Sequence, residues 1–466
     1  MLKTEDIRDF FFLGIGGIGM SGLARYFRSR GYRVSGYDRT PSPLTHQLEE
    51  EGMTIGYEDR VDWLQSLGLD RLTTVVVRTP AVPEDNLIYT SLRADGYVIH
   101  KRAEVLGLVT QQMKALCVAG THGKTTTSTM LAHLLHTSHI GTNAFLGGIS
   151  MNYGTNVLIE PKSDYVVVEA DEYDRSFHRL QPNMSIVTAV DADHLDIYGT
   201  EEAYREAFAH YTSLISEALV MKHGIALQPR LQKGVKLYTY GIQEDRKTGI
   251  PKEYPDFYAD NIRVADGQIA FDFHTPAGTI ASMTLGVPVW VNIENAVAAM
   301  AVAWLNGVTE AELRAGLASF AGVQRRFNIH VNTARVAYID DYAHHPEEIA
   351  TAIDSIRRVF PNRRLIGVFQ PHLYTRTRDF ADDFARVLST LDEVVLLPIY
   401  PARELPIAGV DSEMLLSKIT NPNKRIVDKP ALVDYLKGRK DEGAVVLTVG
   451  AGDIDRLVPD ITAALR

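Results

Sequence analysis

The sequence predicts an α/β protein of three domains, each with a mainly parallel sheet covered by helices. Apolar, β-branched runs of strand length are typical of strands buried on both faces, as in "TTVVV" (73–77), "YVVVE" (165–169) and "VVLTV" (445–449). These runs alternate with segments of helical pattern, which is the order of βαβ units. The chain has 466 residues, and about 150 residues per domain suggests roughly three domains.

The first domain, predicted to span residues 1–112, is expected to be Rossmann-like. A strand in "DFFFLGIGG" (9–17) precedes a helix in "MSGLARYFRSRG" (20–31), and a second strand follows in "YRVSGYD" (32–38). The strand in "LTTVVVRTPAV" (72–82) continues this βαβ order, so we expect a doubly wound sheet.

The second domain is predicted to span residues 113–321 and to be a phosphate-loop α/β domain. Short alternating stretches between residues 235 and 290 predict a small insertion of β-hairpins. "NIENAVAAMAVAWLNG" (292–307) predicts an amphipathic helix, and "TEAELRAGLASF" (309–320) predicts a helix with a Thr/Glu capping start.

The third domain, predicted to span residues 322–466, repeats the strand–helix order and is expected to be Rossmann-like. Its predicted strands lie in "RVAYIDDY" (335–342), "RRLIGVFQPH" (363–372), "LDEVVLLPIY" (391–400) and "EGAVVLTVGAGDI" (442–454).

The composition argues against several classes of function. The formal net charge is −10 at pH 7, whereas a nucleic acid or an anionic membrane would require a basic surface. Cys117 is the single cysteine, which rules out an intramolecular disulfide and a cysteine zinc site. Because neither a signal peptide nor an apolar run of about 18 residues is visible, we expect a cytoplasmic protein without a membrane or nucleic-acid partner.

The stretch "VAGTHGKTTT" (118–127) has the residues of a phosphate-binding loop at a predicted strand-to-helix junction. It departs from the general pattern G-x-x-x-x-G-K-[ST], because Val118 stands where the first glycine is expected and Gly120 follows two positions later. Backbone N–H groups at a helix N-terminus attract an anion, Lys124 adds positive charge, and the Thr125 hydroxyl can bind Mg²⁺. The alternative is a glycine turn followed by capping threonines.

A second glycine loop, "GIGGIG" (14–19), follows the first predicted strand. Gly14, Gly16 and Gly19 match G-x-G-x-x-G, and Asp38 lies where an acid that binds ribose is expected. The motif alone suggests NAD, although any nucleotide diphosphate, or a plain tight turn, would also account for it.

Polar side chains follow the predicted strands of the second and third domains. "EADEYD" places carboxylates suited to Mg²⁺ at a strand end, and a solvated acidic loop is the alternative: Glu169, Asp171, Glu172 and Asp174. "DADHLD" offers His194, which could ligate a second metal, orient a substrate carboxylate or be structural. Arginines suited to carboxylate or phosphate recognition occur at strand ends and at the inter-domain hinge: Arg325, Arg326, Arg376, Arg378 and Arg403. No catalytic cysteine or G-x-S-x-G serine is visible, so direct phosphoryl transfer is the simplest mechanism.

Seven motifs resemble, in the same order, those of the ATP-dependent Mur ligases of peptidoglycan synthesis: "GTHGKTTT", "EADEYDRSF", "DADHLDIYG", "NIEN", "DDYAHHPEE", "FQPHLYTRTRDF" and "YPARE". The resemblance covers nearly the whole chain. It implies a UDP-binding domain, a central ATPase and a C-terminal domain that closes over ATP and the amino acid, with UDP rather than NAD at the first glycine loop. It also implies that the lactyl carboxylate of UDP-N-acetylmuramate is activated as an acyl phosphate and is then attacked by the amine of L-alanine.

The resemblance further implies roles for individual residues. The implied catalytic residues are Lys124, Glu169, His194, Arg326, Asp341 and Arg376. ATP would contact Gly120, Thr121, His122, Gly123, Lys124, Thr125, Thr126, Asn292, Asn295, Arg326, Asp341 and Tyr342. UDP-N-acetylmuramate and L-alanine would contact Gly14, Gly16, Gly17, Gly19, Asp38, His194, Tyr342, His344, His372, Arg376 and Arg378. Two Mg²⁺ ions, or Mn²⁺, would be held by Thr125, Glu169 and His194.

Two departures from the family pattern concern binding contacts. Val291 replaces a frequent histidine beside the adenine site, and "VRTPAVPEDN" (77–86) differs from the usual uracil-side loop. Three other functions stay open at this point: a ligase that recycles murein peptides, an NAD-dependent dehydrogenase, and an ATP-switched binding protein. A monomer and a homodimer are both compatible with the sequence.

Overall fold

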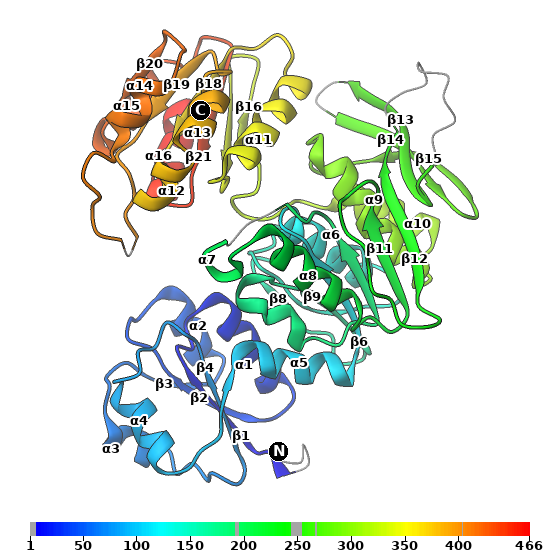
Figure 1. The fold of residues 1–466 in the computed structure, drawn as a ribbon, viewed down its shortest axis with the longest axis vertical. Coiled ribbons are helices and arrows are strands. Elements are labelled where there is room, and N and C mark those ends of the chain that lie inside the picture. The colour runs from blue at the N-terminus through cyan, green and yellow to red at the C-terminus, as the bar shows by residue number, and fades with distance from the viewer. Residues whose placement is uncertain (1–5, 192–194, 244–253, 266–267, 403) are drawn as a thin grey trace. The chain divides into compact units, whose positions relative to one another are not determined.

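The computed structural model describes residues 6–191, 195–243, 254–265, 268–402 and 404–466. The chain forms two compact units (Figure 1). The first contains Met1–Asp260, Asp272–Met283 and Glu294–Phe320, and the second contains Asn261–Phe271, Thr284–Ile293 and Ala321–Arg466. Within the described residues, no helix is long and apolar enough to cross a membrane.

The first unit begins with a five-stranded parallel sheet in the order β3-β2-β1-β4-β5, which confirms the predicted doubly wound architecture. Its strands are β1 (Asp9–Leu13), β2 (Arg33–Tyr37), β3 (Thr54–Gly56), β4 (Thr74–Arg78) and β5 (Ile99–Lys101). Its helices are α1 (Ile18–Ser29), α2 (Pro43–Glu50), α3 (Val61–Ser66), α4 (Leu87–Ala94) and α5 (Arg102–Gln112). Alternate side chains of β1 enter different cores, Phe10 and Phe12 on one face and Phe11 and Leu13 on the other, because successive strand residues point to opposite faces.

A ten-stranded sheet follows, in the order β15-β14-β13-β12-β11-β10-β6-β9-β7-β8. Its strands are β6 (Lys114–Ala119), β7 (Asn143–Phe145), β8 (Val157–Leu158), β9 (Tyr165–Glu169), β10 (Met184–Val187), β11 (Ala218–Lys222), β12 (Lys236–Ile242), β13 (Phe257–Ala265), β14 (Gln268–Thr275) and β15 (Gly278–Thr284). The associated helices are α6 (Lys124–His136), η2 (Tyr173–Arg179), α7 (Leu195–Tyr198), α8 (Glu201–Thr212), α9 (Val291–Leu305) and α10 (Glu310–Ser319). Strand β6 pairs in parallel with both β9 and β10, so the loops after these three strands emerge at one edge of the sheet.

Two expectations for this region need correction. Strand β12 pairs in parallel with β11 and β13, so the first part of the predicted insertion extends the main sheet and is not a hairpin. Helix α9 is not amphipathic over its middle, because every residue from Ala296 to Ala303 is at most 1% exposed. A helix that is apolar all round is buried all round. The capping box of α10 is confirmed, since the backbone N–H of Thr309 donates to Glu312 Oε2 at 2.9 Å.

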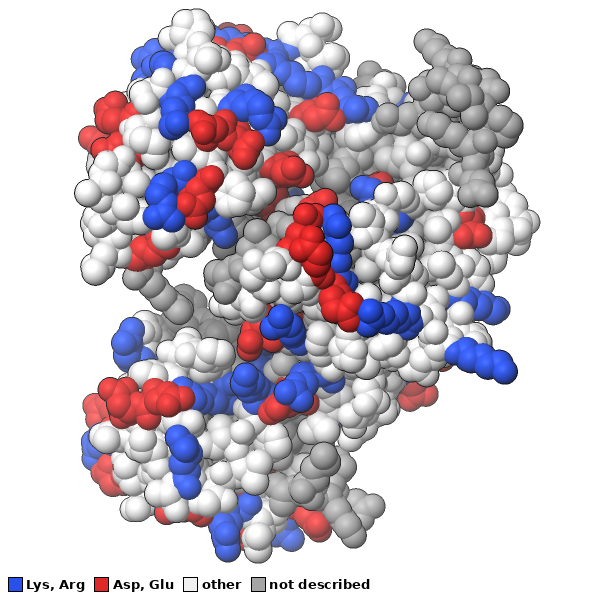
Figure 2. All heavy atoms as spheres, viewed as in Figure 1, with Lys and Arg blue, Asp and Glu red and all other residues white. Residues whose placement is uncertain are grey.

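The second unit contains a six-stranded sheet in the order β16-β17-β21-β18-β19-β20. The strands are β16 (Asn328–Asn332), β17 (Val336–Asp341), β18 (Leu365–Phe369), β19 (Glu393–Leu396), β20 (Lys424–Ile426) and β21 (Ala444–Val449), and only the β16–β17 pair is antiparallel among them. The helices are α11 (Pro346–Val359), α12 (Tyr374–Asp379), α13 (Ala381–Leu388), α14 (Ser412–Lys418), α15 (Lys429–Lys437), η3 (Asp453–Leu457) and α16 (Val458–Leu465). Two separate cores, one with α11, α13 and α14 and the other with α15 and α16, cover the two faces of the sheet, as expected for a Rossmann-like domain (Figure 1). On the face drawn in Figure 2, Lys and Arg are interspersed with Asp and Glu over both units.

Candidate active site

The predicted phosphate loop lies between β6 and α6, packed against the residue that follows β10. Gly120 has a φ of +138°, and a Cβ there would lie 2.0 Å from Thr188 Oγ1. This close approach explains why a glycine occurs at position 120 although the general pattern places its first glycine earlier. The loop is also fixed by Thr121, whose hydroxyl donates to the carbonyl of Asp191 at 2.8 Å.

Lys124 begins α6 and is held by a buried ion pair. Its Nζ donates to the Gly120 carbonyl at 2.6 Å and to Glu172 Oε1 at 2.8 Å. Burial lowers the pKa of Lys124, but the nearby carboxylates outweigh this effect and raise the pKa above its usual value. Glu172 is 1% exposed, and burial raises its pKa against the opposing effect of the lysine. The sequence suggested a metal ligand at Glu172, whereas the structure shows it as the partner of the loop lysine.

The predicted metal ligands Thr125 and Glu169 meet at the ends of α6 and β9. The Thr125 hydroxyl donates to Glu169 Oε1 at 3.0 Å, and the Gly147 N–H donates to Glu169 Oε2 at 3.0 Å. A hydroxyl and a carboxylate are hard oxygen donors, which fit Mg²⁺. The third predicted ligand, His194, lies outside the described residues, as do Asp193 and Arg403. The described part of the chain contains no group of three or more His, Cys, Asp or Glu that could hold a metal.

The loop of residues 146–156 connects this carboxylate to the first glycine loop. At one end Gly147 binds Glu169, and at the other the buried Asn156 donates from Nδ2 to the Ile18 carbonyl at 2.7 Å. Ile18 is the first residue of α1, directly after "GIGG". This connection is not visible in the sequence, because nothing in the loop matches a chemical motif.

Replacing Gly147 by alanine is expected to lower kcat/KM about 100-fold, because the new Cβ would lie 2.3 Å from Glu169 Oε2 and a misplaced catalytic group can cost this much. The concentration of Mg²⁺ that gives the half-maximal rate should rise in the same variant. Gly241→Ala, in β12, is the control, since its backbone is not left-handed and the nearest atom to a Cβ there is Pro255 Cγ at 3.5 Å, an ordinary contact. An unchanged Mg²⁺ dependence in Gly147→Ala would argue against Glu169 as a metal ligand.

Asn292 and Asn295, which were predicted to contact adenine, lie at the start of α9, as the sequence predicted. Asn295 lies at the phosphate loop, where its Oδ1 accepts a hydrogen bond from the Thr127 hydroxyl at 3.1 Å and would lie 3.1 Å from a Cβ on Gly123. Asn292 belongs to the second unit, and its Nδ2 donates to the Val287 carbonyl at 3.4 Å.

The first glycine loop joins β1 to α1, and Gly17 is the N-cap of the helix. The Gly16 N–H donates to Asp38 Oδ2 at 2.8 Å, and the Thr40 N–H donates to Asp38 Oδ1 at 3.1 Å. Asp38 therefore orders the loop itself, a contact that its position in the sequence did not indicate. Near this loop, Gly19 packs against Arg102, a residue that sequence reasoning missed.

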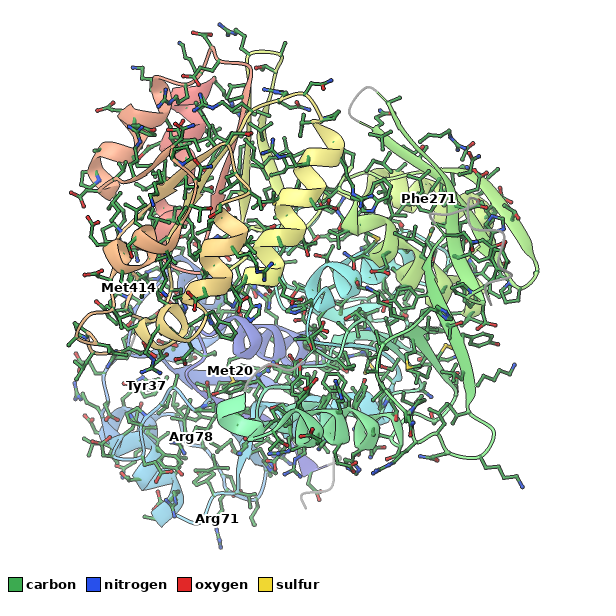
Figure 3. All side chains as sticks on the ribbon, turned by 45° about the horizontal axis from the view of Figure 1, so that its top comes forward. Met20, Tyr37, Arg71, Arg78, Phe271 and Met414 are labelled. Carbon is green, nitrogen blue, oxygen red and sulfur yellow. The ribbon has the colours of Figure 1, made fainter. Side chains whose placement is uncertain are left out.

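The unusual loop of residues 77–86 is held by Arg78 at the end of β4. Its Nη2 donates to the Val82 carbonyl at 2.7 Å, and its guanidinium lies 4.0 Å from the centre of the Tyr89 ring. Figure 3 shows Arg78, Tyr37 and Met20 in the N-terminal part of the first unit.

Two cavities of the first unit differ in whether predicted site residues line them. A cavity of about 70 Å³ has Gly19, Arg102, Gly147, Glu169 and Asp171 among its lining residues. A larger cavity of about 840 Å³ lies at the amino-terminal edge of the strands, near Ile7, Val75 and Asp164. None of the predicted site residues lines the larger cavity, whereas Gly19 and Glu169 line the small one.

In the second unit, Asp341 ends β17 and orders the loop around it. Its Oδ2 accepts from the Phe327 N–H at 2.8 Å and its Oδ1 from the Ala343 N–H at 2.7 Å. Burial raises the pKa of Asp341 to about 6, against the lowering effect of Arg326. The Arg326 guanidinium lies 5.3 Å from the centre of the Tyr342 ring, so three predicted residues come together.

Two histidines and an arginine meet beside this loop. The rings of His344 and His372 are 6.3 Å apart, and Arg376 Nη1 lies 3.4 Å from His372 Nδ1. Burial, Arg376 and His344 together lower the pKa of His372 to about 4, so this ring is neutral at pH 7. Arg378 differs from Arg376, because it is exposed and its Nε pairs with Asp379 Oδ1 at 2.7 Å.

The site thus defines an α/β protein with a phosphate loop, a hydroxyl–carboxylate pair suited to Mg²⁺ and, in the second unit, a cluster of one arginine and two histidines. Family models match most of the chain: "Mur ligase family, catalytic domain" at residues 9–114, "Mur ligase middle domain" at 118–303 and "Mur ligase, glutamate ligase domain" at 325–452. The chain belongs to the Mur ligase family and, like other members, is a ligase of three domains.

Individual relatives agree with this assignment. The chain is 55% identical to a UDP-N-acetylmuramate–L-alanine ligase of Porphyromonas gingivalis over 98% of each protein. It is 44% identical to a ligase of the same name from Flavobacterium psychrophilum, over 100% of this chain and 99% of the relative. A crystal structure of UDP-N-acetylmuramate–alanine ligase from Thermotoga maritima matches 98% of each chain with a TM-score of 0.77 at 28% identity. A murein peptide ligase from Psychrobacter arcticus, at 22% identity and a TM-score of 0.65, shares the fold over 98% of each chain.

Proposed function

We propose that this chain joins L-alanine to the lactyl carboxylate of UDP-N-acetylmuramate and converts ATP to ADP and phosphate. This reaction would be the first amino-acid addition in peptidoglycan precursor synthesis. The observation that carries the proposal is the 55% identity, over 98% of each chain, to a ligase named for these two substrates. An NAD-dependent dehydrogenase would leave the Lys124 loop and the Glu169–Thr125 pair without a role.

The first unit would bind ATP and activate the carboxylate. Gly120, Thr121, His122, Gly123 and Thr126 would surround the phosphates, with Asn295 on the adenine side. Lys124 would neutralise charge on the β- and γ-phosphates, which lowers the barrier to phosphoryl transfer. Thr125, Glu169 and His194 would hold two Mg²⁺ ions, or Mn²⁺, and these cations would reduce repulsion between the lactyl carboxylate and the γ-phosphate.

The chemistry would proceed in two steps. A lactyl carboxylate oxygen attacks the γ-phosphorus of ATP, a new P–O bond forms, and ADP leaves. The free amine of L-alanine then attacks the acyl carbon to give a tetrahedral intermediate, which expels phosphate and leaves an amide.

The second unit would contribute the amino-acid side. Arg376, with His344 and His372, would bind L-alanine, and Arg326, Asp341, Tyr342 and Asn292 would contact the nucleotide. Because His372 is neutral at pH 7, it adds no charge that would repel an ammonium group before the amine loses its proton. Gly14, Gly16, Gly17, Gly19 and Asp38, in the first unit, would form the UDP side.

We also propose domain boundaries at residues 1–112, 113–321 and 322–466, a cytoplasmic location, and a monomer or homodimer without a nucleic-acid or membrane partner. The family models begin and end close to these boundaries, which supports them.

Release of phosphate from ATP is expected to require UDP-N-acetylmuramate and L-alanine together. A coupled assay across UDP-N-acetylmuramate, its peptidyl forms, L-alanine, glycine, L-serine and the tripeptide of murein would measure this. Because one methyl group is worth about 1–3 kcal/mol in a pocket, glycine should be used about 10- to 200-fold less efficiently than alanine. Turnover without an amine would indicate an ATP-switched protein, and turnover with the tripeptide alone would indicate a recycling ligase.

A further inference from the structure

The loop of residues 146–156 is held at its middle as well as at its two ends. The Tyr153 hydroxyl lies 2.7 Å from Nδ1 of His133, and Nε2 of the same ring lies 2.9 Å from the Ser319 hydroxyl. Asn152, next to Tyr153, donates from Nδ2 to the Ser319 carbonyl at 2.8 Å. His133 belongs to α6 and Ser319 to α10, so the middle of the loop is attached to two helices of the first unit.

The hydrogen bonds around His133 have one consistent direction. The Ser319 hydroxyl donates to the Gly316 carbonyl at 3.2 Å, so its oxygen can accept the proton of His133 Nε2. Burial and the nearby His136 lower the pKa of His133 to about 4, and burial raises the pKa of Tyr153 to about 12. At pH 7 the ring is therefore neutral and the phenol is protonated, so the Tyr153 hydroxyl donates to Nδ1.

Hydrogen bonds within the loop connect its middle to Gly147. The Gly154 N–H donates to the Ser150 carbonyl at 2.8 Å, and the Ser150 N–H donates to the Thr155 carbonyl at 2.9 Å. A third backbone bond, also of 2.9 Å, closes the base of the loop between residues 146 and 156. Because these bonds make the loop one compact piece, an anchor at Tyr153 also restrains the N–H of Gly147.

His133 fixes this piece against the helix that begins at the phosphate loop. Thr125 lies in the first turn of α6 and His133 in its last turn. Glu169 accepts from the Thr125 hydroxyl through Oε1 and from the Gly147 N–H through Oε2, both at 3.0 Å. Helix α6 therefore restrains both oxygens of this carboxylate, one directly through Thr125 and the other through the loop.

We propose that His133 is a positioning residue for the metal site: through the Tyr153 hydroxyl it holds the loop of residues 146–156, and with it the Glu169 carboxylate, in the geometry that binds Mg²⁺. The proposal rests on the proposed function, because it takes Glu169 as a ligand of Mg²⁺. His133 acts through the loop and not on a substrate, since it is 3% exposed and its two ring nitrogens face Tyr153 and Ser319.

The test separates the two ring nitrogens of His133. An asparagine places its side-chain oxygen near the position of Nδ1, whereas a glutamine places its amide near the position of Nε2. His133→Asn should therefore still accept the Tyr153 hydroxyl, and His133→Gln should keep only the contact with Ser319.

The measurement is a calorimetric titration of Mg²⁺ into the full chain with a non-hydrolysable ATP analogue. The Mg²⁺ concentration for half-maximal binding is expected to rise about 5- to 10-fold in Tyr153→Phe and in His133→Gln, the usual cost of one buried hydrogen bond. In His133→Asn it should rise less than about twofold. Tyr254→Phe, at a tyrosine that is 58% exposed, is the control and should titrate like the wild type.

A double-mutant cycle and the unfolding temperature exclude a purely structural effect. Adding Tyr153→Phe to His133→Gln should cause little further loss of Mg²⁺ affinity, because both changes remove the same hydrogen bond. A structural role alone would lower the unfolding temperature of both histidine variants and leave their Mg²⁺ titrations unchanged. That result, additive losses in the cycle, or equal losses in His133→Asn and His133→Gln would overturn the proposal.

The same experiment distinguishes failure of the proposed function from failure of the positioning role. If the wild type and the variants titrate as expected but the wild type releases no phosphate with L-alanine, the proposed function fails and the role of His133 stands. If Mg²⁺ does not change binding of the analogue to the wild type, Glu169 holds no metal and the role of His133 fails.

Discussion

Replacing Lys124 by alanine is expected to lower the rate of phosphate release about 1,000-fold or more. The lysine is the only side chain of the loop "GTHGKT" that carries a permanent positive charge, and the transferring phosphoryl group is strongly anionic. UDP-N-acetylmuramate should still bind, because its glycine loop lies in a different domain. Stopped-flow phosphate detection and calorimetry with UDP-N-acetylmuramate measure the two properties separately.

Because Lys124 forms an ion pair with the buried Glu172, the experiment needs a second variant in which Glu172 is replaced as well. In Lys124→Ala the carboxylate of Glu172, whose side chain is 2% exposed, loses its ion pair. An uncompensated buried charge costs about 3–5 kcal/mol of stability, so the single variant should also unfold at lower temperature. Lys124→Ala combined with Glu172→Gln removes the unpaired charge and should regain stability but not activity. Activity in either lysine variant, or loss of UDP-N-acetylmuramate binding, contradicts the separate roles of the two loops.

Replacing Arg376 by alanine is expected to raise the KM for L-alanine about 100-fold. No carboxylate of the described residues forms an ion pair with Arg376, which leaves its guanidinium available for the carboxylate of the amino acid. Losing one partner of a hydrogen-bonded charge pair typically costs 2–5 kcal/mol, or about 30-fold and more in affinity. Steady-state kinetics with varied L-alanine at saturating ATP give the value, and the KM for ATP should stay within about threefold.

Arg378 is the internal comparison for this experiment. The sequence predicts that both arginines contact substrate, whereas the structure pairs the exposed Arg378 with Asp379. An exposed ion pair contributes about 0–1 kcal/mol, so Arg378→Ala should change the KM for L-alanine by less than about fivefold. If the two variants have equal effects, the amino acid is bound elsewhere or by both side chains.

Much of this fold is visible in the sequence, because buried parallel strands have a distinctive composition. Runs such as those of β4, β9 and β21 are mainly apolar and β-branched, and their alternation with helices predicts parallel pairing. The prediction that helix α9 is amphipathic was wrong, because its apolar residues are not confined to one face. Its middle, from Ala296 to Ala303, contains only alanine, valine and methionine and is buried on all sides, and a single sequence does not show which neighbours cover it.

The site is only partly visible in the sequence. Residues that follow strands, such as Lys124, Glu169 and Asp341, are predictable because parallel strands end at one edge of their sheet. Arg102 and the pairing of Glu172 with Lys124 were not predictable, because both depend on contacts between segments far apart in the chain. His194, a central prediction, lies outside the described residues and stays a prediction.

The loop of residues 146–156 has a consequence for which acceptors the enzyme can use. It holds the carboxylate of Glu169 through Gly147 and the start of α1 through Asn156. If the first glycine loop binds the diphosphate and Glu169 binds the metal, as proposed, one short stretch of backbone would set the distance between these two groups. The number of bonds between the diphosphate and the reacting carboxylate of an acceptor would have to match this distance. A muramic acid that already carries amino acids would place its carboxylate farther from its diphosphate, so we expect a longer loop in ligases that accept longer acyl groups.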